Sequence, residues 1–137
     1  AFKRLIDVFG SLENKKVVFL GISYRGDVGD TRFTPVEPLV NMVKNEGAII
    51  KLHDPYVSFW EEQKCEVEKD IDRVFKDDPD LIIISTGHTI YSSKKIISKL
   101  MKLKRTSIYD TVGILDNTHL KDLGNKHILS VLGRGDI

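Results

Sequence analysis

Residues 17–35 read VVFLGISYRGDVGDTRFTP, in which four apolar residues lead to Gly21 and a polar loop that contains further glycines. Such an apolar run is typical of a strand that is buried on both faces of a parallel sheet. Thr34 and Pro35 predict that a helix follows, because the hydroxyl can cap the first turn and proline has the φ that this turn needs. The loop between strand and helix contains two arginines and two aspartates. Open α/β sheets bind ligands where strands end, so this loop is the expected binding site.

Apolar runs and helical patterns alternate along the remainder of the chain. Strands are expected at 48–53, 81–85, 107–110 and 127–132, and helices at 2–12, 35–46, 70–76 and from Ser92 or Ser93 to 103, with a turn or short helix at 116–123. The charged span 61–70 is expected to be a solvated surface and 133–136 an exposed tail. This alternation predicts an α/β fold: a doubly wound, Rossmann-like parallel sheet of about five strands with helices on both faces. Residues 1–14 are expected to end a linker helix, and residues 15–137 to form one domain.

The composition narrows the classes of partner. The 137 residues include 21 basic and 20 acidic ones. The net charge is therefore close to zero and creates no positive electrostatic field that would attract a polyanion, so nucleic acid is not an expected partner. No apolar run reaches the ~18 residues of a membrane helix, and no membrane partner is expected. The single Cys65 excludes an internal disulfide, which fits a reducing cytoplasm. The chain starts at Ala1 and not at methionine, from which we expect a fragment or a processed chain.

The polar loop lacks the G-x-G-x-x-G fingerprint of a dinucleotide-binding turn, because Ser23 stands where the second glycine would be. It resembles instead the opening of the C-terminal domain in the nucleotide-sugar 6-dehydrogenases, the UDP-glucose/GDP-mannose dehydrogenase family. That opening is roughly G-x-A-F/Y-K-x-D-x-x-D-x-R-x-S-P. Ser23, Arg25 and Thr34 replace the alanine, the lysine and the serine of the pattern.

Three weaker marks extend the resemblance over roughly residues 15 to 137. They are HDP at 53–55, where the family has Tyr-Asp-Pro, TGH at 86–88 and YDT at 109–111. After the third expected strand, His88 is followed three residues later by the aromatic Tyr91. This pattern resembles the family members that act on UDP-N-acetylhexosamines more than those that act on UDP-glucose. Within the first mark, Asp54 is expected to satisfy neighbouring backbone amides at the end of its strand.

Enzymes of this family oxidise the C6 alcohol of a nucleotide sugar to a carboxylate in two NAD-dependent steps, and they hold the aldehyde on a cysteine. The resemblance implies that the NAD fingerprint and this cysteine precede the present region. No catalytic residue is therefore expected in this chain, and the chain alone is expected to be inactive. The implied partners are a UDP-sugar, NAD, the N-terminal and central domains of the same polypeptide and a second copy in a homodimer. The implied process is polysaccharide biosynthesis.

The resemblance also assigns roles to single residues. Tyr24 and Arg25 match an aromatic–lysine pair that contacts the substrate, and a guanidinium suits a diphosphate because it can donate two parallel hydrogen bonds. Arg32 matches the arginine that reaches across the interdomain cleft to NAD. His88 is expected to contact the substrate, and Arg134 is a candidate for a second phosphate or cofactor contact.

Other interpretations of these residues stay open. Asp27 and Asp30 could hold Mg²⁺, but loop aspartates more often make local turns, so no metal site is expected and Asp30 is expected to orient an arginine or the loop backbone. His88 could equally be an ordinary loop histidine. For the whole chain, the alternatives are a non-catalytic signalling module of receiver type and a purely structural interaction domain. A receiver needs a phosphoacceptor at the third strand, where this chain has Ser85 and Thr86.

Overall fold

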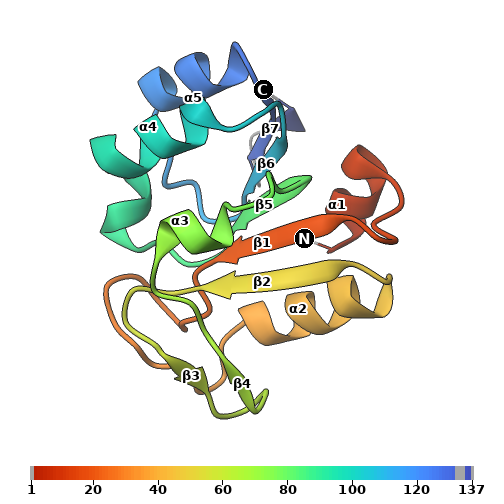
Figure 1. Ribbon diagram of the computed structural model, residues 1–137, viewed down its shortest axis with the longest axis vertical. Coiled ribbons are helices and arrows are strands. Elements are labelled where there is room, and N and C mark those ends of the chain that lie inside the picture. Colours follow the sequence, from red (N-terminus) through yellow and green to blue (C-terminus); the bar gives the residue numbers. More distant parts are fainter. Residues whose placement is uncertain (1, 132–134, 137) are drawn as a thin grey trace.

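The computed structural model describes residues 2–131 and 135–136, and it confirms the α/β fold (Figure 1). In chain order the elements are α1 (Phe2–Phe9), β1 (Lys16–Leu20), α2 (Val36–Asn45), β2 (Ile49–His53), β3 (Phe59–Trp60), β4 (Cys65–Glu66), α3 (Ile71–Val74), β5 (Leu81–Ile84), the 3₁₀-helix η1 (Thr89–Ser92), α4 (Lys94–Lys102), β6 (Ser107–Asp110), α5 (Asn117–Gly124), β7 (Ile128–Val131) and β8 (Gly135–Asp136). Each helix and strand that the sequence predicts is present.

The strands of the main sheet lie in the order β2-β1-β5-β6-β7-β8, and every neighbouring pair is parallel except β7 and β8. β1 lies between β2 and β5, so that Leu20 pairs with His53 on one side and with Ile84 on the other. After β2 the chain therefore returns across β1 before it adds β5. The strand order reverses between β1 and β5, which is the place where doubly wound sheets bind their ligands.

Helices cover both faces of the sheet, as a doubly wound fold requires (Figure 1). On one face, α1 and α2 share a core with Val17 and Phe19 of β1. On the other face, α3, α4 and α5 share a core with Val18 and Leu20. Successive side chains of a strand point to opposite faces, so the apolar run of β1 contributes to both cores. Because both faces of β1 are buried, polar residues can begin only after the strand ends at Leu20.

Three short strands were not expected from the sequence. β3 and β4 pair as an antiparallel hairpin, and β4 lies within the span 61–70 that was expected to be a solvated surface. The indole of Trp60, in β3, is 0% exposed and lies in the same core as α2. Each of these strands has two residues, which is too short for an alternating pattern to be recognised. β8 takes the place of part of the expected exposed tail, because its two residues pair with β7.

Hydroxyl groups mark the starts of two helices. Before α2, Thr34 Oγ1 accepts a hydrogen bond from the N–H of Val36 at 3.3 Å. Of the two serines that could cap α4, it is Ser93 that does so, accepting from the N–H of Ile96 at 3.3 Å. Of the helices in the described part of the chain, none has the length and apolar character needed to span a membrane.

Candidate functional site

The carboxyl ends of β2, β1 and β5 meet at one edge of the sheet (Figure 1). We call the loops that leave these strands, residues 21–34, 54–57 and 85–92, the rim. Two of them, the loops after β1 and β5, flank the point at which the strand order reverses. The rim therefore lies where the fold places a ligand, and it contains most of the residues that the sequence predicts for binding.

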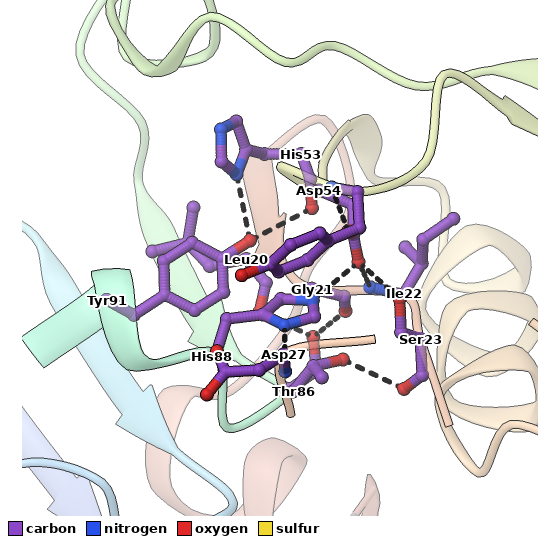
Figure 2. Close-up of polar contacts among 12 residues, drawn as sticks. Leu20, Gly21, Ile22, Ser23, Asp27, His53, Asp54, Thr86, His88 and Tyr91 are labelled. Carbon is purple, nitrogen blue, oxygen red and sulfur yellow. Dashed lines mark hydrogen bonds and ion pairs between the residues drawn. The ribbon is translucent and has the colours of Figure 1, made fainter. Parts of the chain in front are cut away.

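The carboxylate of Asp54 lies at the centre of the rim and is fully buried. Its Oδ2 atom accepts hydrogen bonds from the N–H of Ile22 at 3.0 Å, the hydroxyl of Ser23 at 2.8 Å and Nε2 of His88 at 2.9 Å (Figure 2). Its Oδ1 atom accepts from the N–H of Tyr56 at 2.9 Å. Burial raises the pKa of this carboxyl, but the hydrogen bonds from His88 and the two amides outweigh burial and hold the pKa below its usual value. Asp54 is thus a charged acceptor inside the protein.

The ring of His88 is also fully buried. Its Nδ1 atom accepts the N–H of Asp27 at 2.8 Å (Figure 2). Because a backbone N–H can only donate, Nδ1 bears no proton, and the neutral ring donates its Nε2–H to Asp54. The carboxylate of Asp27 in turn accepts the hydroxyl of Thr89 at 2.5 Å and the N–H of Thr89 at 2.8 Å, and these bonds lower the pKa of Asp27. The loops after β1 and β5 are therefore joined through His88 and Asp27.

A second buried pair, Tyr91 and His53, lies beside the first (Figure 2). The hydroxyl of Tyr91 donates to Nδ1 of His53 at 2.8 Å, and Nε2–H of His53 donates to the carbonyl of Lys69 at 3.1 Å. Burial lowers the pKa of His53 and raises that of Tyr91. Both rings are therefore neutral, and they fill the space behind His88, whose ring centroid is 5.5 Å from that of Tyr91.

Two glycines allow the loops after β1 and β5 to lie in direct contact. A Cβ on Gly21, whose φ is +100°, would lie 2.3 Å from Cβ of Thr86. A Cβ on Gly26 would lie 2.2 Å from the carbonyl oxygen of Gly87. The hydroxyl of Thr86 adds a hydrogen bond of 3.0 Å to the carbonyl of Ser23. The crevice between these loops is therefore closed by the chain itself at these points.

That outer surface carries the exposed side chains of the loop. Tyr24 is 55% exposed, Phe33 is 94% exposed, and Arg25 is exposed as well. The guanidinium of Arg32, which is 77% exposed, donates two hydrogen bonds of 3.0 Å to the two carboxylate oxygens of Asp30. These bonds lower the pKa of Asp30, and they confirm the prediction that Asp30 orients an arginine. The loop thus offers two cations and two aromatic rings to its surroundings.

The structure groups three of the five predicted site residues. Tyr24, Arg25 and Arg32 lie on one exposed loop, and their contacts with a ligand stay predictions. His88 contacts the same loop but is buried, since its ring is 0% exposed and both of its nitrogens are bonded to protein atoms. A direct contact with substrate would require this ring to leave its position. Arg134 lies outside the described residues.

The role of Asp54 is wider than the sequence indicates. Its bond to the N–H of Tyr56 agrees with the expectation that it satisfies a neighbouring amide. Its bonds to His88 and to the loop after β1 were not expected. The strand order could have shown them, because the ends of β2, β1 and β5 become neighbours only in a sheet with this order.

A cavity of about 700 Å³ lies apart from the rim, beside β2. Its lining is mixed, with apolar side chains such as Ile50 and Leu52 beside charged ones such as Glu68 and Arg73, and it includes Cys65. Burial raises the pKa of the Cys65 thiol, so the thiol is protonated and a weak nucleophile at neutral pH. In the ranges 2–131 and 135–136, no three His, Cys, Asp or Glu side chains gather as a group that could hold a metal ion.

Comparisons with known proteins agree on one family. The model described as "UDP-glucose/GDP-mannose dehydrogenase family, UDP binding domain" matches residues 18–117. A UDP-N-acetyl-D-mannosamine dehydrogenase of Methanococcus maripaludis is 28% identical over 127 residues, which are 90% of this chain and 28% of that protein. UDP-glucose 6-dehydrogenase 4 of Arabidopsis thaliana is 37% identical over 51 residues, which are 37% of this chain and 11% of that protein.

A solved structure extends the similarity to nearly the whole chain. The crystal structure of an NDP-N-acetyl-D-galactosaminuronic acid dehydrogenase from Methanosarcina mazei Go1 superposes with a TM-score of 0.76 at 26% identity. The match covers 97% of this chain and 27% of that one. The chain thus spans little more than a quarter of the length of these dehydrogenases.

Proposed function

The chain belongs to the UDP-glucose/GDP-mannose dehydrogenase family as a UDP binding domain, and from this premise we propose that it holds the nucleotide of a UDP-sugar on the outer surface of the loop 21–34. The observation that carries the proposal is the closed crevice between the loops after β1 and β5. It leaves the exposed face of the first loop as the surface from which Tyr24 and Arg25 can reach a ligand.

Arg25 is the proposed contact to the diphosphate. Its guanidinium is exposed and can donate two parallel hydrogen bonds to phosphate oxygens. The loop that carries it is held on both sides, by bonds to Asp54 and to His88. A held loop loses little conformational entropy when a ligand binds, which favours affinity. Tyr24, next to it, offers an exposed ring for the sugar or the base.

Arg32 is the proposed contact to NAD. Two of its five N–H groups are bonded to Asp30, which fixes the plane of the guanidinium and leaves the remaining N–H groups for a phosphate of the cofactor. NAD supplies the hydride acceptor when it is bound. The chain alone offers one side of such a site, so its N-terminal and central domains, within a homodimer, are proposed to supply the other.

The substrate of the whole enzyme is proposed to be a UDP-N-acetylhexosamine, oxidised at C6 to the carboxylate. Relatives that are UDP-N-acetyl-D-mannosamine dehydrogenases support this class, over up to about nine-tenths of the chain. The nucleophile and the NAD fingerprint are proposed to belong to the other domains, because Cys65 lies away from the rim and burial raises the pKa of its thiol. The isolated chain is accordingly proposed to be inactive.

The receiver-type alternative has no support. β5 ends at Ile84 and is followed by Ser85 and Thr86, and neither side chain is the carboxylate that a receiver phosphorylates. The family to which the chain belongs is one of dehydrogenases.

Titration of the chain with UDP and with GDP, followed by amide chemical shifts, tests the proposal. UDP is expected to bind more tightly than GDP. Arg25→Ala is expected to weaken UDP binding by about 1 to 3 kcal/mol, or about 5- to 150-fold, because a hydrogen bond to a charged group is lost. Arg105→Ala is the matched control, since Arg105 is also an exposed loop arginine but precedes β6 at the opposite end of the sheet. Equal UDP affinity in the two variants would contradict the assignment.

A further inference from the structure

The carboxylate of Asp54 connects loops that are far apart in the sequence. On the loop after β1 it holds Ile22 and Ser23, which are 32 and 31 residues away. On the loop after β5 it holds His88, which is 34 residues away. Figure 2 shows the backbone N–H of Ile22 and the side chains of Ser23 and His88 gathered around one carboxylate. One buried charge therefore links the two loops, in addition to their direct contacts.

His88 extends the connection to the far side of the loop after β1. Its Nδ1 atom holds the N–H of Asp27, while Asp54 holds the start of the same loop at Ile22. Tyr24 and Arg25 lie between these two attachment points. The segment that carries the proposed ligand contacts is thus fixed at both ends by one pair of side chains, and neither of the pair is exposed.

Asp110 shows that a buried carboxylate at a strand end need not act in this way. Asp110 is 1% exposed and accepts the N–H groups of Val112 at 3.1 Å, Gly113 at 2.8 Å and Leu115 at 2.9 Å. All three partners follow within five residues. Asp110 therefore closes its own turn, whereas Asp54 joins different loops.

We propose that Asp54 and His88 are positioning residues that hold the segment 22–27 in the conformation that binds the nucleotide. The identity of the ligand rests on the proposed function above, and the positioning of the segment does not. Neither side chain touches the ligand. Their effect on affinity comes through Tyr24 and Arg25.

The proposal has a quantitative consequence. If the pair is broken so that about one molecule in ten keeps the segment in its binding conformation, the apparent Kd rises about tenfold, because the other molecules must first reorder. The affinity of the ordered molecules is unchanged. The loss of affinity therefore accompanies a change in the backbone of residues 22–27 in the absence of any ligand.

His88→Gln is the principal variant, and His127→Gln is its matched control. His127 is 4% exposed, accepts the N–H of Thr106 on Nδ1 at 3.1 Å, and shares a 2.7 Å bond between Nε2 and the carbonyl of Leu100. Like His88, it accepts a backbone N–H on Nδ1 and bonds a protein oxygen through Nε2. It lies just before β7, however, at the opposite end of the sheet. Both variants lose a buried imidazole, and only one loses a bond to the loop after β1.

Variants of Asp54 separate charge from hydrogen bonding. In Asp54→Asn the amide oxygen can take the place of Oδ2 and keep its three bonds, at the cost of the bond from Tyr56. In Asp54→Ala all four bonds are lost. The asparagine variant is therefore expected to keep most of the affinity for UDP that the alanine variant loses. Ser23→Ala, which removes only one bond, serves where Asp54→Ala does not fold.

The measurements are the amide shifts of residues 22–27 without ligand, the Kd for UDP and the urea midpoint of each variant. We expect His88→Gln to move these amides and to raise the Kd about tenfold. His127→Gln should lower the urea midpoint and leave amides and Kd as in the parent chain. Unchanged amides in His88→Gln, or the same change of Kd in both histidine variants, would overturn the proposal. Should the parent chain not respond to UDP, the proposed function fails, and the amide shifts still decide the positioning role.

Discussion

At Gly26 the loop after β1 lies directly against the backbone of Gly87, so that a Cβ would come within 2.2 Å of the Gly87 carbonyl oxygen. A backbone atom cannot move aside as the end of a flexible side chain can. Gly26→Ala should therefore push the two loops apart and lower the free energy of unfolding by about 1 to 3 kcal/mol, the usual cost of an overpacked site. Urea denaturation measures this change.

Gly124→Ala is the control for that substitution. A Cβ on Gly124, in α5, would lie 3.5 Å from Cδ1 of Leu129, an ordinary contact distance. Alanine is also the better helix former by about 1 kcal/mol. The control should be as stable as the parent chain or more so. Equal stability of the two variants would mean that the loops are not in contact at Gly26.

Single residues also show how much of the site could be predicted from the sequence. The motif predicts that Tyr24, Arg25 and Arg32 lie together on one loop, and the structure leaves all three exposed there. His88 has the same kind of motif support, yet the structure buries its ring. Whether a polar residue at a strand end points out or in depends on which other strand ends surround it. That information lies in the strand order and not in the local sequence.

The hairpin of β3 and β4 was not predicted from the sequence. Helices and long strands repeat their apolar positions often enough to be recognised, and β1 and β5 consist almost wholly of such positions. The hairpin has one deeply buried side chain, Trp60, among charged residues. Its burial is decided by α2 and β1 in the same core, which lie far away in the chain.

The two residues of β3 allow a direct test of this packing. Trp60 is 0% exposed and Phe59 is 42% exposed, because neighbours on a strand face opposite sides. Trp60→Ala should lower the free energy of unfolding by about 3 to 5 kcal/mol. Phe59→Ala should lower it by about 0.5 kcal/mol or less, as surface substitutions do. Similar losses in urea denaturation would show that the hairpin is not packed as described.

For the whole molecule, buried histidines make stability depend on pH. Burial lowers the pKa of His53 and of His127, so below the ordinary histidine value of about 6.5 the unfolded chain binds protons that the folded chain does not. The stabilisation is complete above this pH and is lost as the pH falls toward the folded-state values. The free energy of unfolding should decrease by up to about 1.4 kcal/mol per pH unit for each histidine.

Urea denaturation between about pH 7.5 and 5 measures this slope. The slope should become smaller in His127→Gln, which removes one of the two groups. Asp54 adds a separate loss in more acidic solution, because its pKa is held below the ordinary value of about 3.9 and protonation removes its stabilisation there. A free energy of unfolding that stays constant, or rises, as the pH falls from 7 toward 5 would contradict the buried, neutral state of these rings.

At the same scale, the fold supports the proposal that this domain offers one side of a site. The strand order produces a crevice between β1 and β5, and the chain fills it with Thr86, His88 and the close approach of two glycine-containing loops. What remains is a firmly held outer loop with exposed arginines. Such a surface needs a second surface opposite it to enclose a ligand, and the chain spans little more than a quarter of its relatives.

Intermolecular NOEs between UDP and the ¹³C-labelled chain test the location of the ligand most directly. The ribose and uracil protons are expected to show NOEs to the ring of Tyr24 and the side chain of Arg25, on the outer surface of the loop. They are expected to show none to the methyl group of Thr86, which is 2% exposed between the loops. NOEs to Thr86 or to the ring of His88 would contradict binding on the outer surface, because they would place the nucleotide inside the crevice between the two loops.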